Sequence, residues 1–431
     1  MGSLRMLWLI GISFIAMVLS AYAEDGAVEI KPGEVLNLQK CVDIALRQHP
    51  DIWASRYNVQ VAESKVGQAR AGYYPQITAT TGYSNTKSMS TPEVTGKSLN
   101  DYIGQTTLKQ NLIDFGRTSS QVDVQRKTAQ ASLFDSENTV AQVVFNVKQA
   151  YYSLLRAQKN RDVAAEIVKQ YELHLNQAKG LYEVGTKPKI DVTKAEVDLT
   201  NARLNLIKAE NAVKIAKATL DNAMGLPLAP DYVIEDGLTM DKLSITFDEA
   251  LERAYKERAD LKSLRAKVEA AARSVDFAKK DFYPNLGTKI TYSIPKNGNF
   301  SGDDWDVGLS FSMPIFSGFS TTYKVQEAKA NLGLLKANEE ALKQRIYLEV
   351  KEAYLNMVEA EERIKAAELA AKQAQENLEL ARGRYGVGAG SSIEMTDALV
   401  AYARSQVEYI QALYDYKIAE ASLLKAMGVS K

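Results

Sequence analysis

The chain has 431 residues, a formal net charge of zero, 46% hydrophobic residues and a single cysteine. This neutral balance argues against a nucleic-acid partner, which would require a basic face. Cys41 has no second cysteine for an intrachain disulfide, and the only two histidines, His49 and His174, are far apart in sequence. We therefore expect no metal site, no cofactor and no catalysis, and we expect Cys41 to be a small buried hydrophobic residue.

Residues 1–23 have the pattern of a secretory signal peptide. Arg5 provides a positive charge, an apolar run extends from Leu7 to Leu19, and Ala21-Tyr22-Ala23 is a small-x-small cleavage site. We expect the mature chain to begin at Glu24, outside the cytoplasm. No later stretch of about 18 apolar residues occurs, so the sequence predicts no transmembrane helix.

The rest of the chain carries the same motifs twice. Val147-Lys-Gln-Ala-Tyr151 returns 203 residues later as Val350-Lys-Glu-Ala-Tyr354. We interpret this as two structural repeats, because similarity at a fixed offset is the signature of repeated units. Their expected bounds are residues 24–224 and 247–431, with a connector over residues 225–246.

The predicted elements follow one order in both repeats: a helix, two strands, a long helix and a final helix. In the first repeat we place them at residues 38–73, 76–84, 102–113, 117–184 and 189–224. In the second repeat they fall at residues 247–282, 285–294, 305–315, 319–385 and 393–427. The first helix of each repeat ends before a proline, Pro75 or Pro284, because proline and the residue before it disfavour helix.

The two long helices carry apolar residues at alternating spacings of three and four, as in Val140, Val144, Val147, Tyr151 and Leu154. This heptad-like pattern is typical of helices that pack along one another. Each would be roughly 100 Å long at 1.5 Å per residue. Such a rod does not fit inside an ordinary globular domain, so we expect it to pack beside helices of similar length.

The predicted strands alternate apolar and polar residues, most clearly from Trp305 to Met313. One interpretation is an ordinary antiparallel sheet with one wet face. The other is a membrane barrel, because each strand is about ten residues long and aromatic residues cluster at the strand ends. Four strands cannot close a barrel, so several chains would have to contribute; three copies would give about twelve strands, although the number three does not follow from the strands.

The duplicated turns Tyr182-Glu-Val-Gly185 and Tyr385-Gly-Val-Gly388, each followed by an alanine-rich helix, are similar to those of the TolC-like outer-membrane efflux proteins. The resemblance covers nearly the whole mature chain. It implies an α+β membrane protein that forms a homotrimer, with a twelve-stranded β-barrel in outer-membrane lipid and a long periplasmic α-helical barrel. It also implies two protein partners, a periplasmic adaptor (membrane fusion) protein and an inner-membrane transporter.

The same resemblance implies a periplasmic gate made by acidic residues and a tyrosine. By position these residues are Asp191, Tyr385, Glu394 and Asp397. The sequence departs from the pattern at Gly390, where some members have an arginine that latches the closed state. Adaptor docking is expected at the helical tips, formed by Val184, Gly185, Val387 and Gly388.

A second role is open for Glu394, because Ser391-Ser-Ile-Glu394 also matches a capping box at a helix start. The two roles are compatible. The glycines at residues 386–390 join two helices and follow no strand, so we do not expect a phosphate-binding loop. The sequence thus predicts an exit duct that passively conducts exported solutes or polypeptides; the alternative is a non-conducting structural trimer that tethers the outer membrane to the periplasm.

Overall fold

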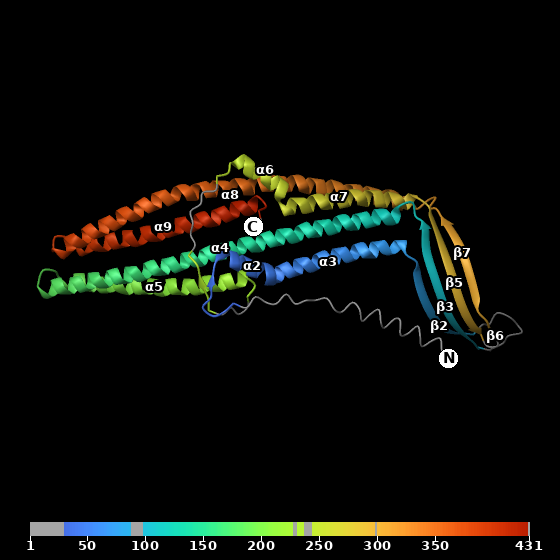
Figure 1. Ribbon diagram of the computed structural model, residues 1–431, viewed down its shortest axis with the longest axis horizontal. Coiled ribbons are helices and arrows are strands. Elements are labelled where there is room, and N and C mark those ends of the chain that lie inside the picture. Colours follow the sequence, from blue (N-terminus) through green and yellow to red (C-terminus); the bar gives the residue numbers. More distant parts are fainter. Residues whose placement is uncertain (1–29, 88–97, 227–230, 237–243, 298–299, 430–431) are drawn as a thin grey trace. The chain divides into compact units, whose positions relative to one another are not determined.

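The structure is a computed structural model that describes residues 30–87, 98–226, 231–236, 244–297 and 300–429 (Figure 1). The expected signal peptide lies outside these residues. The described chain forms two compact units, each built from separate parts of the sequence. The tip unit comprises the described residues within 1–52, 142–243 and 356–422, and the sheet unit comprises those within 53–141, 244–355 and 423–431.

Helices make up most of both units. In chain order they are α2 (Leu38–Gln48), α3 (Pro50–Arg70), α4 (Arg117–Glu183), α5 (Lys189–Ala223), α6 (Phe247–Glu257), α7 (Ala259–Lys279), α8 (Ser320–Gly386) and α9 (Ser392–Ala426). Two short 3₁₀ helices, η1 (Ala71–Tyr73) and η2 (Lys280–Phe282), precede the strands. The long helices α4 and α8 lie within one residue of their predicted bounds. None of the helices in the described residues is long and apolar enough to cross a membrane.

The first helix of each half is broken, and here the prediction was wrong. We expected continuous helices over residues 38–73 and 247–282, but the chain leaves helical geometry at His49 (ψ 125°) and at Arg258 (ψ 124°). Pro50 explains the first break, because the residue before proline is driven out of the helical region. The second break has no proline. Arg258 instead forms ion pairs with Asp260 (2.6 Å) and Glu349 (2.5 Å).

A glycine packs against each break. Gly225 and Gly428 both have positive φ, and a Cβ atom there would lie 2.8 Å from the Cα of His49 and 2.7 Å from the backbone nitrogen of Arg258, respectively. Both glycines follow the last helix of their half, α5 or α9. Glycine is therefore required twice over, for its backbone conformation and for the close approach.

The sheet unit contains one antiparallel sheet with strands β2 (Gln76–Lys87), β3 (Ser98–Ile113), β5 (Asn285–Asn297), β6 (Phe300–Ser301) and β7 (Asp304–Ser312). The long strands are ordered β2-β3-β5-β7, so the middle pair joins the two halves of the sequence. The register places Ile77, Leu108, Ile290 and Val307 in one row across the four strands. The apolar sides of all four strands consequently share one face.

The tip unit contains a short parallel pair of strands, β1 (Val35–Leu36) and β4 (Val233–Ile234). The Tyr151 hydroxyl donates a hydrogen bond to the carbonyl of Glu235 (2.6 Å) and so ties α4 to this pair. Cys41 is fully buried beside it, as predicted, and burial raises the pKa of its thiol to about 12. A neutral, inaccessible thiol of this kind is a packing residue.

Candidate functional site

Two turns at the end of the tip unit carry the residues implicated by the sequence. The first turn connects α4 to α5. Gly185 has φ +79° and donates its N–H to the carbonyl of Tyr182 (2.9 Å), while Thr186 donates to Leu181 (2.9 Å). These bonds satisfy carbonyl groups at the end of α4, which otherwise have no partner within the helix. Pro188 then begins α5 without a side-chain cap.

The second turn connects α8 to α9 and is more tightly closed. Gly388 has φ +79°, and the N–H groups of Ala389 and Gly390 both donate to the carbonyl of Arg384 (3.0 and 2.9 Å). A Cβ atom at Gly390 would lie 2.9 Å from the backbone nitrogen of Tyr385. The departure from the family pattern at Gly390 therefore has a packing reason, because a side chain there would displace the end of α8.

The two turns are joined by a lysine that the sequence analysis missed. The Nζ atom of Lys187, in the first turn, donates to the carbonyl of Gly390 (2.8 Å) in the second. The same ammonium lies 5.6 Å from the centre of the Tyr385 ring. Lys187 thus combines a charged hydrogen bond with a cation–π contact at the point where the two hairpins meet.

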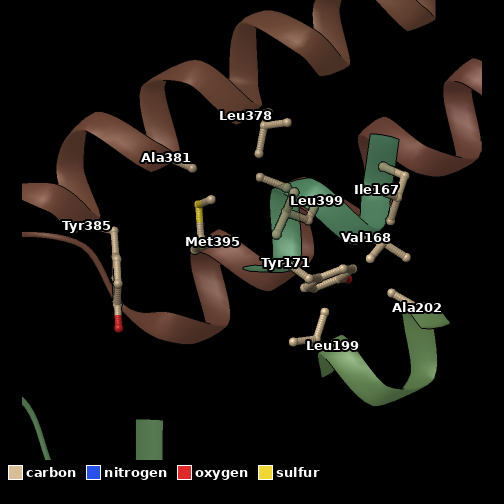
Figure 2. Packing of buried hydrophobic residues seen from close by; sticks show 11 residues of the cluster. Ile167, Val168, Tyr171, Leu199, Ala202, Leu378, Ala381, Tyr385, Met395 and Leu399 are labelled. Carbon is tan, nitrogen blue, oxygen red and sulfur yellow. The ribbon is translucent and has the colours of Figure 1, made fainter. Parts of the chain in front are cut away.

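Behind the turns, the hairpins α4–α5 and α8–α9 share a hydrophobic cluster (Figure 2). Its buried members are Ile167, Val168, Tyr171, Leu199, Ala202, Leu378, Ala381, Tyr385, Met395, Ala398 and Leu399. Tyr385 is fully buried. Burial, followed by the negative charge of Asp191, raises the pKa of the Tyr385 phenol, against the opposing influence of the Ser392 hydroxyl. Tyr385 therefore joins the helices here by packing.

His174 of α4 completes this contact. Its side chain is 0% exposed, and its ring meets the Tyr385 ring edge-on with centroids 4.9 Å apart. The Ser392 hydroxyl lies 3.4 Å from Nε2 of His174, whereas Nδ1 has no partner among the described residues. Burial lowers the pKa of the His174 imidazole, against the opposing influence of Asp198.

The predicted gate acids lie at the starts of the two final helices, Asp191 on α5 and the other two on α9. Glu394 and Asp397 are exposed and three residues apart, so they lie on one face of α9. The Glu394 carboxylate pairs with Nε of Arg384 (3.0 Å). Half of the expected capping box is present, because the backbone N–H of Glu394 donates to Oγ of Ser391 (3.0 Å). Its carboxylate is engaged by the arginine rather than directed back to the helix start.

The predicted docking residues form an exposed apolar tip on each turn. Val184 is 74% exposed and Val387 is 81% exposed. A Cβ atom at Gly185 would meet nothing within 4 Å, and one at Gly388 would lie 3.6 Å from Cγ2 of Thr186. Both tips are thus accessible in the single chain, with small glycine neighbours that leave the valines unobstructed.

The second candidate surface is the apolar face of the sheet. On β7 the side chains that point to this face are largely exposed, with Trp305 at 76% and Leu309 at 72%. Tyr292 and Ile294 of β5 are also exposed. An apolar surface of this kind on a soluble protein would mark an interaction site or a contact with lipid.

Comparison with known proteins identifies the family. Residues 41–226 and 250–429 match the family model described as outer membrane efflux protein. The chain belongs to this family. Membership places this outer-membrane efflux protein at the outer membrane.

Individual relatives are distant but match along their length. The chain is 23% identical to the outer membrane protein TolC of Vibrio cholerae over 408 residues, covering 91% of this chain and 90% of that protein. It is 24% identical to the alkaline protease secretion protein AprF of Pseudomonas aeruginosa, covering 98% and 88%.

Solved structures share the fold. The CmeC outer membrane channel of Campylobacter jejuni superimposes with a TM-score of 0.80 at 19% identity, covering 91% of this chain and 86% of that one. The MtrE outer membrane channel of Neisseria gonorrhoeae, solved in its open state, gives a TM-score of 0.77 at 18% identity, covering 95% of each.

Proposed function

We propose that three copies of this outer-membrane efflux protein assemble into an exit duct, which passively conducts cargo received from an inner-membrane transporter and a periplasmic adaptor. The apolar, exposed face of the sheet carries the proposal. Its strands are long enough to span a bilayer when tilted, and the register keeps their apolar sides together. Lipid is the environment in which such a face is stable.

The free edges of the sheet support an assembly of several chains. Within the described residues, β2 pairs with β3 alone and β7 pairs with β5 alone. Unpaired backbone groups in lipid cost several kcal/mol each, so open edges do not persist there. Joining β2 of one copy to β7 of the next removes both edges, and three copies close a barrel of about twelve strands.

The helices also support an assembly of several chains. Ile190, Val197 and Leu204 of α5 are exposed apolar residues spaced seven apart. A heptad stripe of this kind packs against a neighbouring helix in a coiled-coil arrangement. Neighbouring copies would cover it in a helical barrel that continues the duct.

The experiment combines assembly and conduction. Native mass spectrometry of detergent-purified protein should give a trimer, and trimers in a planar bilayer should conduct ions. A stable monomer would overturn the barrel, whereas a trimer that never conducts would favour a tether between outer membrane and periplasm.

We further propose that the valine tips dock the adaptor, because Val184 and Val387 are apolar, exposed and held on tight turns. Val387→Asp should reduce site-specific crosslinking of the trimer to the adaptor. Val35→Asp, which changes an exposed valine of β1 outside both turns, should not. If both variants lose crosslinking to the adaptor equally, or if neither loses it, the valine tips do not dock the adaptor.

Finally, we propose that Asp191, Glu394 and Asp397 line the periplasmic constriction and that Tyr385 holds it by packing. Symmetry would repeat each carboxylate three times around one axis. The ion pair with Arg384 offsets part of the Glu394 charge, which makes Asp397 the stronger contributor to a cation-attracting ring.

A further inference from the structure

The contact between His174 and the α8–α9 junction has a property that the duct function does not explain. His174 is fully buried, yet its Nδ1 has no hydrogen-bond partner among the described residues. Buried polar atoms are usually satisfied, so an unsatisfied ring nitrogen in this contact requires an explanation. A contact that is only marginally favourable can be switched by a small change.

We propose that His174 is a proton-sensitive link at the tip: the neutral imidazole holds α4 against the α8–α9 junction, and its protonation releases that contact. The inference rests on the proposed duct, because it assigns the tip a closed and a released state. It names the proton as the regulating ligand of that site.

The chemistry of the ring explains the direction. A neutral imidazole has one donor and one acceptor, whereas an imidazolium has two donors and a positive charge. The protonated ring would therefore place a donor at Nδ1, which has no acceptor among the described residues, in a fully buried position. It would also add a second cation beside the Tyr385 ring, which already lies 5.6 Å from the Lys187 ammonium.

The charges around His174 do not supply that acceptor. On α5, Asp198 already accepts from Lys194 (3.0 Å) and from Thr396 of α9 (3.1 Å). Asp191 lies in the first turn of α5, and its negative charge raises the pKa of both His174 and Tyr385, against the effect of burial on His174.

The remaining groups are positive or already paired. The ammonium of Lys187, in the first turn, faces the Tyr385 ring. The positive charge of Lys194 lowers the pKa of His174 and so disfavours protonation of the imidazole. At the α8–α9 junction, Arg384 and Glu394 pair with each other. On α4 itself, Tyr171 contributes a neutral phenol whose pKa burial raises to about 12.

The pH window follows from the sign of the shift. Burial lowers the pKa of His174 in the closed contact, and release into water would return it to about 6.5. The contact is therefore fully favourable above about pH 6.5 and weakens as the pH falls through the lower, buried pKa. Each unit of difference between the two pKa values shifts the equilibrium by up to about tenfold. Carboxylates in ordinary surroundings titrate near pH 4, so the range from about 5 to 7 isolates the histidine.

The experiment exploits the fact that the chain has only two histidines. Hydrogen exchange of residues 171–177 and 385–395 is measured in full-length trimers at about pH 7.5 and about pH 5.5, after correction for the intrinsic rate. The unaltered protein and the control His49→Gln should lose protection there at the lower pH, by up to about tenfold per unit of pKa difference. His174→Gln should show no such loss.

Equal pH dependence in His174→Gln, or none in the unaltered protein, would overturn the link. If His174→Gln does not assemble, the test is instead an NMR titration of His174 in the His49→Gln variant, where it is the only histidine. A pKa of His174 near the ordinary value of about 6.5 would refute the proposal. Conductance in a planar bilayer distinguishes failure of the proposed duct from failure of the proton-sensitive contact. Trimers that never conduct but lose protection in acid would refute the duct and leave the proton-sensitive contact standing.

Discussion

Replacing Gly390 by alanine tests whether the second turn keeps the tip closed. The added Cβ would lie 2.9 Å from the backbone nitrogen of Tyr385 and 3.1 Å from the carbonyl carbon of Arg384. Both are backbone atoms, which cannot move aside as a flexible side chain would. The turn must therefore open at the two hydrogen bonds that position 390 makes, its N–H to Arg384 (2.9 Å) and its carbonyl to Lys187 (2.8 Å).

The size of the effect follows from those bonds. A neutral backbone hydrogen bond contributes about 1 kcal/mol, and one made by a charged donor contributes about 1.5–3 kcal/mol. Loss of both would weaken the closed tip by about 2.5–4 kcal/mol, and partial adjustment would leave a smaller value. Gly383→Ala is the matched control, because Gly383 lies in α8 with nothing within 4 Å of its Cβ position. Alanine there should stabilise the helix by about 0.5–1 kcal/mol.

The assay is the ion conductance of single trimers in a planar bilayer, together with the thermal unfolding midpoint. We expect Gly390→Ala to raise the conductance and lower the midpoint, and Gly383→Ala to leave the conductance unchanged. If the two variants behave alike, the close contact at Gly390 does not hold the tip shut.

Two further predictions concern the proposed gate and the face of the sheet that we propose meets lipid. The double variant Glu394→Gln with Asp397→Asn should reduce cation selectivity, measured as the reversal potential in a salt gradient. Carboxylates about 8 Å apart repel each other by roughly 2 kcal/mol at an effective dielectric near 20. Such a cluster attracts cations, because a bound cation relieves the repulsion. Unchanged selectivity with a lower unfolding midpoint would mean that the acids only stabilise α9. Leu309→Arg should impair insertion into lipid vesicles, at a cost of about 2–4 kcal/mol per chain near the bilayer centre, whereas Ser310→Arg on the opposite face should insert normally. Equal insertion of both, measured as the folded fraction on gels, would show that this face does not meet lipid.

The long elements were predictable because their signals are local. Proline and glycine mark where α4 and α8 begin and end, and between these points helix-forming residues repeat with a heptad-like period. The strands were predicted from alternation alone, and their register then follows from keeping the apolar sides together. In the sheet, β2 and β3 extend further than expected, to Lys87 and from Ser98. Their outer ends are polar, so the period of two no longer distinguishes strand from loop.

The two broken helices differ in how far their breaks could be predicted. The break at His49 has a local signal in Pro50, which the prediction of one continuous helix over residues 38–73 overlooked because the helical pattern continues across it. At Arg258 no local residue announces a break, and the conformation depends on Glu349 and Gly428, both distant in sequence. Tertiary contacts decide such positions, and a single sequence does not show them.

The same division applies to the tip. The gate acids and Tyr385 were placed by resemblance, and the glycine turns by their motif. His174 was considered only as a ligand or a catalyst, because its partner Ser392 lies 218 residues away. Arg384 was overlooked because the family pattern directs attention to position 390. Its helical neighbourhood gave no signal that it would reach Glu394 across the turn.

The unequal closure of the two turns indicates where the tip would separate. Within the second turn, Gly390 donates to the end of α8 and Ser391 caps α9, so the α8–α9 hairpin is held by its own backbone. The first turn has its glycine bonds but begins α5 at Pro188 without a side-chain cap. Between the hairpins, the polar contacts near the turns are made by side chains: Lys187 bonds to a carbonyl, His174 to Ser392, and Thr396 of α9 to Lys194 and Asp198 of α5. Side-chain contacts across a shared surface are lost more readily than backbone bonds within a turn, because each can break without unwinding a helix. We infer that opening moves the α4–α5 hairpin away from an intact α8–α9 hairpin, which breaks these side-chain contacts and leaves the backbone bonds within each turn in place.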